Sequence, residues 1–172
     1  MPETSYIEGN LHVRGTLSAS SNSPSSGSIT DTHVSGTAAI SATKMVHQYA
    51  VEVELYGPTT TVAALTKLFH IAQSAGTIVA FKAFVITPAT GADRTVNVDL
   101  QKSTGAGAFA TVLSATALFN NGSSARTLAS GTVSSASYIA SDLFQVVVTV
   151  AGAAGNQALG LYCVMEVRQN PA

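Results

Sequence analysis

Charge, tryptophan and cysteine are all scarce in this sequence. Charged residues make up 10% of its 172 positions, and 8 basic and 9 acidic side chains leave a net charge of −1. Because nothing in this balance would displace counterions from phosphates, we expect no binding to nucleic acid. The single cysteine, Cys163, excludes an internal disulfide and a cysteine-rich zinc site. Apolar runs fall short of the about 18 residues of a membrane span, so we expect no membrane association.

Small side chains take the place of the missing charge. Alanine, serine, threonine and glycine together supply 81 of the 172 residues. So few charges leave little with which to cover the exterior of a monomer. Small and hydroxyl-bearing surfaces also allow close packing between copies, so we expect a homo-oligomer.

The sequence divides into an arm, residues 1–48, and a β-rich domain, residues 49–172. Between Gly15 and Thr43 the only formal charge is Asp31, and residues 18–28 hold seven serines. Such a segment cannot bury a core of its own, which predicts an extended arm rather than a folded unit. The alternative is an unanchored tail.

Spaced apolar residues distinguish this arm from a featureless linker. Within residues 6–17, Leu11, Val13 and Leu17 lie at odd positions with polar or small residues between them, which is the signal of a strand. A second patterned stretch covers residues 29–45. The side chains that we expect to anchor the arm to another surface are Leu11, Val13, Leu17, Ile29, Val34, Ile40 and Met45.

Alternating hydrophobicity predicts strands from Tyr49 onward. In the first, Val51 and Val53 alternate with acidic residues, and Gly57 with Pro58 is expected to end it. Apolar residues on both faces of residues 77–87 predict a strand covered on two sides. Further strands are expected over residues 96–101, 144–150 and 159–167. Two segments, residues 59–75 and 108–119, fit both a helix and a strand, and strands are the expectation for both.

The number and spacing of these segments predict the fold class. About eight short strands separated by turn signals are typical of an all-β, antiparallel β-sandwich, with a jelly roll as the first choice. No alternation of strands with helices appears, so a parallel doubly wound sheet is not expected. The predicted architecture is therefore a jelly-roll-like sandwich preceded by the extended arm.

One pair of carboxylates has a spacing that catalysis could use. Glu52 and Glu54 lie on one face of a predicted strand, about 7 Å apart at the usual rise of a strand. Two acids at such a separation can flank a glycosidic bond. Alternating acids on a strand more commonly form its solvated face, and we favour that interpretation. We therefore predict that the protein is not an enzyme and that it needs no cofactor.

The remaining motifs indicate structure rather than chemistry. His12, His33, His47 and His70 show no metal-ligand spacing, so no metal site is expected. Residues 105–110 match the spacing of a glycine-rich nucleotide-binding loop but lack its βαβ context, which favours a hairpin loop. Residues 121–123 match a glycosylation sequon and are interpreted as a turn. Cys163 falls in the buried phase of the last strand and should be inert. Tyr138, in a predicted loop over residues 134–141, is the one loop aromatic that could stack on a sugar.

Several short stretches are similar to tailed-bacteriophage virion proteins. In the arm these are residues 6–17, 27–31 and 39–48, and in the β-rich part residues 78–83, 96–102 and 112–114. The resemblance implies a structural role as a capsid decoration protein, a head fibre or a tail-fibre component, often trimeric. It implies no catalytic residues.

Composition and resemblance together predict a specific role. We expect a capsid decoration protein of the cement or head-fibre type, which binds the outer capsid as a homo-oligomer, a trimer, through its arm. Its partners would be the major capsid protein or other virion proteins, its location the capsid exterior, and its place of synthesis the host cytoplasm. The alternative is a receptor-binding protein of a tail or head fibre that contacts host glycans.

Overall fold

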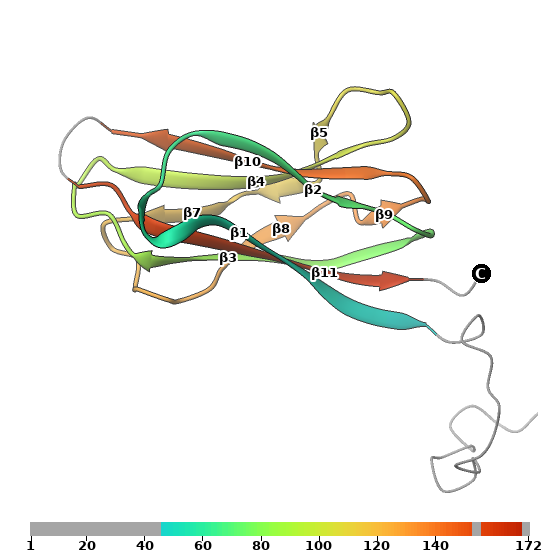
Figure 1. The fold of residues 1–172 in the computed structure, drawn as a ribbon, viewed down its shortest axis with the longest axis horizontal. Helices are drawn as coiled ribbons and strands as arrows, with labels where there is room; N and C mark the ends of the chain where they lie inside the picture. The colour runs from blue at the N-terminus through green and yellow to red at the C-terminus, as the bar shows by residue number, and fades with distance from the viewer. Residues whose placement is uncertain (1–45, 153–155, 170–172) are drawn as a thin grey trace, which may run out of the picture. The chain divides into compact units, whose positions relative to one another are not determined.

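The computed structural model describes residues 46–152 and 156–169, in which eleven strands form and no helix does (Figure 1). The strands are β1 (His47–Thr61), β2 (Leu65–Ile71), β3 (Gly76–Thr87), β4 (Thr95–Ser103), β5 (Ala110–Thr111), β6 (Leu113–Ala115), β7 (Ala117–Asn120), β8 (Ala129–Val133), β9 (Ser137–Tyr138), β10 (Leu143–Ala151) and β11 (Leu159–Gln169). Accordingly, no helix in these residues is long and apolar enough to cross a membrane.

The strands form two antiparallel sheets packed face to face. One sheet has the order β1-β11-β3-β8-β6, with β9 beside β3, and the other has the order β2-β10-β4-β5, with β7 beside β4. From β1 to β4 the chain changes sheet at every step, and it does so again from β9 to β11. With the short strands β5, β6 and β9 taken as additions, the remaining eight strands have the order of a jelly roll, β1-β11-β3-β8 against β2-β10-β4-β7, which confirms the predicted β-sandwich.

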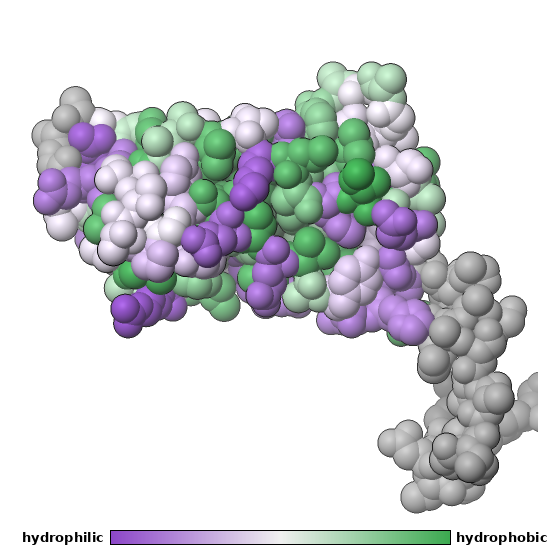
Figure 2. All heavy atoms as spheres, viewed as in Figure 1, coloured by the Kyte–Doolittle hydropathy of each residue, from purple (hydrophilic) through white to green (hydrophobic). Residues whose placement is uncertain are grey.

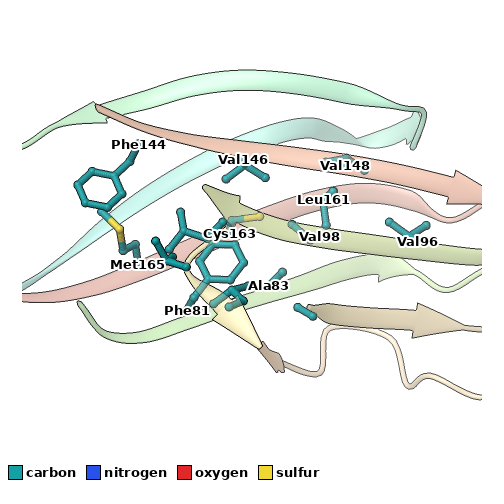
Figure 3. Packing of buried hydrophobic residues seen from close by; sticks show 14 of the residues in the cluster. Phe81, Ala83, Val96, Val98, Phe144, Val146, Val148, Leu161, Cys163 and Met165 are labelled. Atoms are coloured by element: carbon teal, nitrogen blue, oxygen red, sulfur yellow. The ribbon is translucent and has the colours of Figure 1, made fainter. Parts of the chain in front are cut away.

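The core lies between the sheets and follows the predicted alternation of each strand. Figure 3 shows side chains of β3 and β11 from one sheet meeting those of β4 and β10 from the other. The largest fully buried members are Phe81, Phe119, Phe144, Leu100, Leu161 and Met165. Cys163 is among the buried residues, and burial raises the pKa of its thiol to about 12. The prediction of an unreactive core cysteine is confirmed.

Both ambiguous segments contain strands, as expected. Residues 59–75 hold the end of β1 and all of β2, while residues 108–119 hold β5, β6 and most of β7. The expected number of about eight strands is too low, because β5, β6 and β9 are only two or three residues long. Strands as short as these have too few residues to show an alternating pattern in the sequence.

The prediction that Gly57 and Pro58 end the first strand is wrong. β1 continues to Thr61, although its pairing with β11 shifts between Tyr56 and Thr61. Proline has no N–H to give to a ladder, but an edge strand with a bulge tolerates it. Since β1 is the outer strand of its sheet, the two residues bend the strand without ending it.

The prediction that residues 77–87 are covered on both faces is also wrong. One face of β3, including Phe81, Ala83 and Val85, is buried in the core. On the other face Lys82 and Phe84 are only half-buried. Apolar residues at outward positions of β3 therefore reflect a semi-exposed surface and not a second layer.

The arm lies outside the described residues. β1 begins at His47, close to the predicted start of the β-rich domain at residue 49. The structure describes nothing of residues 1–45, so the arm and its boundary stay predictions.

Candidate functional site

All seven arm residues predicted to anchor the protein lie outside the described residues. These are Leu11, Val13, Leu17, Ile29, Val34, Ile40 and Met45. His12 and His33 also lie there. The described residues can therefore show the surface next to the arm but not the arm's own contacts.

Exposed apolar side chains gather at the end of the sandwich where the described chain begins. Val46, Ile71, Val79 and Ile139 are 42–55% exposed, and we call these four residues the apolar end. In Figure 1 this end is the one near β9 and the last residues of β11. In Figure 2 hydrophobic residues, in green, lie mainly over the middle and the upper right of the view, with hydrophilic residues, in purple, between them. Clustered apolar exposure of this kind marks interaction surfaces.

The strand register places Val46, Ile71 and Ile139 at one end of the sandwich, and Val79 lies three residues into β3 from that end. His47, next to Val46, pairs with Gln169, and Gln169 pairs in turn with Gly76 at the start of β3. Gly76 pairs with Tyr138, which precedes Ile139. At the end of β2, Ile71 pairs with Leu143, and the Ala72 N–H donates to the Asp142 carbonyl at 2.9 Å. Sequence reasoning missed this set, because only the topology joins them.

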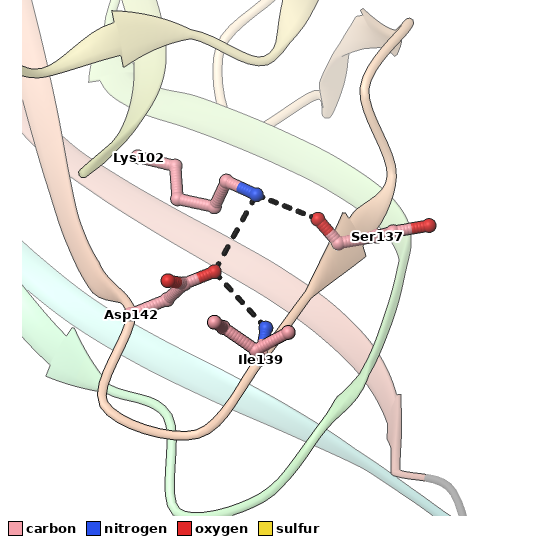
Figure 4. A network of polar contacts seen from close by, with 4 residues as sticks. All are labelled: Lys102, Ser137, Ile139 and Asp142. Carbon is pink, nitrogen blue, oxygen red and sulfur yellow. Dashed lines mark hydrogen bonds and ion pairs between the residues drawn. The ribbon is translucent and has the colours of Figure 1, made fainter. Parts of the chain in front are cut away.

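A buried ion pair holds the loop that carries Ile139. Lys102 Nζ lies 3.4 Å from Asp142 Oδ2 and donates to the Ser137 carbonyl at 2.7 Å (Figure 4). The Ile139 N–H donates to the same carboxylate oxygen at 3.0 Å. Asp142 is 1% exposed, so its charge depends on these partners. The network fixes residues 137–142 as a rigid rim of the apolar end.

Opposing effects act on the Asp142 carboxyl. Burial favours its neutral form, but the Ile139 N–H and the Lys102 ammonium favour the charged form, and together they hold its pKa below the ordinary value of 3.8. The Thr104 side chain lies close enough to contribute, yet Oδ1 has no hydrogen bond of normal geometry within the described residues. Asp142 is therefore a charged, buried structural group.

Tyr138 is not the exposed loop aromatic that the sequence predicted. It lies in β9 and is 3% exposed, and its ring packs edge-on against Phe144 at 5.6 Å. Burial, with the nearby Tyr49, raises the pKa of its hydroxyl to about 12. Gly76 makes room for this ring, since a Cβ there would lie 2.4 Å from the Tyr138 hydroxyl oxygen. The tyrosine is a core residue and cannot stack on a ligand.

The aromatic surface of this protein lies elsewhere, on the outer face of the sheet that contains β1, β11 and β3. Tyr162 pairs with Phe84 on one side and with Glu54 on the other. The two rings stack with centroids 5.0 Å apart and planes 6° apart. Burial, together with the Glu54 carboxylate, raises the pKa of the Tyr162 hydroxyl. In the sequence, the available signal for this pair was that Tyr162 and Phe84 both occupy outward-facing positions of their predicted strands.

Glu52 and Glu54 lie beside this pair, exposed on β1. With Tyr162, Phe84 and Val164 they line a shallow hollow of about 320 Å³. No ion pair within residues 46–152 and 156–169 involves either glutamate. The arrangement offers carboxylate acceptors next to aromatic rings, which is a chemistry that suits hydroxyl-rich or cationic groups.

The described histidines do not form a ligand cluster. His70 Nε2 is buried and has no hydrogen-bond partner among the residues that the structure describes, and burial lowers the pKa of this ring. Its ring centroid lies 5.8 Å from that of Phe144. In the part of the chain that the structure describes, no group of three or more His, Cys, Asp or Glu side chains could hold a metal ion.

A second hollow, of about 600 Å³, lies between the ends of β1, β3, β10 and β11, at the end of the sandwich opposite the apolar end. Its polar lining includes Thr61, Thr90, Asn156 and Gln157. The Gln157 Oε1 is buried there without a hydrogen bond in the described residues. Arg94 is the charged residue of this lining, and the other polar groups are neutral amides and hydroxyls.

The two loop motifs are turns, as the sequence indicated. Gly105 has a φ of 61°, and the Ser103 hydroxyl donates to the Gly107 carbonyl at 2.6 Å. At the sequon, the Asn120 N–H donates to the Ser123 hydroxyl at 2.9 Å. In both loops the polar groups satisfy the turn itself.

Comparison with known proteins gives little. No protein-family model matches the sequence, and no curated protein matches it either. Among solved structures, a chain of the "Structure of infectious bursal disease virus Gt strain" is 16% identical, with a TM-score of 0.29. The match covers 74% of this chain and 38% of that one. At this TM-score we carry neither fold detail nor function from that chain to this one.

Proposed function

We propose that this chain is a non-enzymatic structural protein of a tailed-bacteriophage virion. It acts as a capsid decoration protein of the cement or head-fibre type, which binds the outer capsid surface as a homotrimer through its N-terminal arm. The observation that carries the proposal is the apolar end. Four of the seven exposed large hydrophobic residues of the described chain lie where that chain begins after the arm.

The physical chemistry of this surface suits attachment to a protein lattice. Apolar side chains gain free energy when a partner removes them from water, without need of charge. The low charge of the whole chain fits the same mode of contact. The partners would be the major capsid protein or other virion proteins, and the protein would reside on the capsid exterior after synthesis in the host cytoplasm.

Capsid binding is expected to require both the arm and the apolar end. Removing residues 1–45 should abolish co-sedimentation with capsids that lack the protein, while circular dichroism shows that the sandwich still folds. In the full chain, Ile139→Lys should weaken binding by about tenfold, because a buried aliphatic side chain contributes roughly 1.5 kcal/mol or more.

Leu128→Lys is the matched control for the point variant. Leu128 is 53% exposed, similar to Ile139, but lies near Arg126, whose N–H bonds to Val85 at the other end of the sandwich. Its binding should equal that of the unmodified chain. Equal losses in both variants, or full binding without residues 1–45, would contradict the proposal.

A second candidate function, glycan binding by a receptor-binding fibre protein, is favoured by the stacked aromatic pair. Tyr162 and Phe84 line the hollow that also holds Glu52 and Glu54. Aromatic faces and carboxylates are the groups that sugar rings and hydroxyls contact. If this candidate is right, a glycan array probed with the full chain gives reproducible binding that Tyr162→Ala abolishes. A silent array, or binding that Tyr162→Ala leaves intact, removes it.

A further inference from the structure

The first strand of the sandwich has an open edge. Within the described residues β1 pairs only with β11, so its other side offers unpaired backbone N–H and C=O groups. Near Glu54 this edge is partly covered, since Lys67 Nζ donates to the Glu54 carbonyl at 3.0 Å. Among the described residues, no side-chain hydrogen bond of this kind covers the stretch from Gln48 to Val53, which contains no glycine, proline or lysine.

The inner face of this stretch is incompletely buried. Val51 pairs with Met165, and Met165 with Phe81, yet only the two inner members of this row are fully buried. The next row, which begins with Val53, repeats the pattern, with Cys163 and Ala83 buried. Both valines pack against the core but remain half-exposed. One more strand beyond β1 would complete these rows.

The arm contains a segment whose hydrophobic pattern suits a strand added beside β1. Residues 6–17 carry Leu11 and Val13 at alternating positions. A strand from this segment, added to β1 with those two side chains inward, would cover Val51 and Val53. Strand addition of this kind gains main-chain hydrogen bonds and needs no charge.

The charges of the two segments match as well. Because successive side chains alternate between faces, placing Leu11 and Val13 inward places His12 and Arg14 on the outer face. On that face β1 presents Glu52 and Glu54, which have no ion pair within the described chain. Opposite charges side by side on neighbouring strands stabilise their pairing. Pairing β1 with a second β1 instead would bring like charges together.

We propose that residues 10–16 of a second copy of this chain add as a strand to the open edge of β1, along residues 48–54. This interface rests on the proposed function, in which the chain is a homo-oligomer with an interacting arm. It assigns residues 10–16 a partner within the oligomer, the sandwich of a neighbouring copy. The rest of the arm and the apolar end then stay available to the capsid.

Cysteine pairing tests both the partner and the face. Full-length Val13→Cys protein is mixed with full-length Val53→Cys protein and oxidised mildly, and mass spectrometry identifies the linked peptides. A disulfide between positions 13 and 53 is expected, because inward neighbours on adjacent strands come within the roughly 4.4–6.8 Å between Cα atoms that a disulfide needs. Native Cys163 is 1% exposed and should stay reduced.

Glu52→Cys is the matched control, one residue away on the opposite face of β1. Mixed with Val13→Cys, it should give no disulfide. Equal yields at positions 52 and 53, or no disulfide at either, would overturn the proposal. A doubly substituted Val13→Cys, Val53→Cys chain that forms the disulfide only within one molecule would also overturn the proposal.

A charge reversal gives a second, independent readout. Arg14→Glu should weaken self-association by about fivefold in sedimentation, at the upper end of what an exposed ion pair contributes, and Glu54→Arg in the same chain should restore it. Arg126→Glu, an equal charge change in a distant loop, should have no effect. If the second substitution fails to restore self-association, that result contradicts the interface. Capsid binding after removal of residues 1–45 is measured separately, so the proposed function can hold even if the interface does not.

Discussion

Phe81→Ala is expected to lower the free energy of unfolding by about 4 kcal/mol, as measured by urea denaturation. Phe81 is fully buried in the middle of β3, where it pairs with Met165 of β11. Across from it, a Cβ at Gly131 would lie only 3.2 Å from the Phe81 ring, so glycine is the residue that this ring leaves room for. Truncation therefore leaves a cavity that the neighbouring glycine cannot fill. A loss of this size is a large share of the stability of an ordinary domain.

Phe84→Ala is the matched control for Phe81→Ala, three residues further along the same strand. Phe84 lies on the outer face, where it is half-buried against Tyr162. Its removal should cost about 1 kcal/mol, the contribution of one aromatic pair. Equal losses from the two variants would contradict the assignment of β3 faces. A small loss at Phe84 would also show that the aromatic surface can be changed without unfolding the protein.

Lys102→Met is expected to lower the free energy of unfolding by about 3 kcal/mol at neutral pH. Methionine keeps most of the aliphatic stem but removes the ammonium that faces Asp142 at 3.4 Å. The carboxylate, 1% exposed, then keeps the Ile139 N–H as its one hydrogen bond of normal geometry. An uncompensated buried charge is what makes the single substitution costly. Thermal or urea unfolding of both proteins measures the difference.

Asp142→Asn in the Lys102→Met protein supplies the control. The amide oxygen still accepts the Ile139 N–H, while the stranded charge disappears, so most of the lost stability should return. A double variant no more stable than Lys102→Met would contradict a charge-based mechanism.

The same pair predicts a pH dependence with a definite sign. The pKa of Asp142 lies below its ordinary value of 3.8, so its stabilising contribution is present above pH 3.8 and is lost as the pH falls through the folded-state pKa. In Lys102→Met the ammonium no longer opposes burial, and the carboxyl pKa rises relative to the unmodified protein. The difference in stability between the two proteins should therefore shrink as the solution is acidified.

These predictions distinguish the residues beside the apolar end that stabilise the fold from the residues of the apolar end that are exposed to a partner. Lys102 and Asp142 fix the loop of residues 137–142, while Ile139 itself is 55% exposed and contributes little to the core. A change at Ile139 should therefore alter binding and leave stability nearly unchanged. The capsid test and the stability tests then report on different properties.

Local patterns of hydrophobicity were sufficient to predict a strand and its buried face where the strand is long and has one face in the core. Val96, Val98 and Leu100 alternate with polar residues, and all three are fully buried in β4. The pattern failed where small residues form a strand. β8 escaped notice because its alanine, serine and glycine look like a loop, yet Gly131 is needed beside Phe81 and Leu113.

Tyr138 illustrates a different failure. Its surroundings in the sequence, serines and alanines, indicate an exposed loop. Contacts with Phe144 and Gly76, both distant in sequence, bury it instead. No local signal distinguishes a loop tyrosine that folds inward from one that faces solvent, because the space it fills belongs to other strands.

The sequence alone determined the all-β class, the buried faces of β4, β10 and β11 and the inert cysteine, since these depend on the two-residue repeat of a single strand. Tertiary structure decided which strand lies at a sheet edge, which exposed side chains share one end, and that Phe84 meets Tyr162. These features depend on strand order and register, which are set by contacts between residues far apart in the chain. A repeat within one strand carries no information about its neighbours.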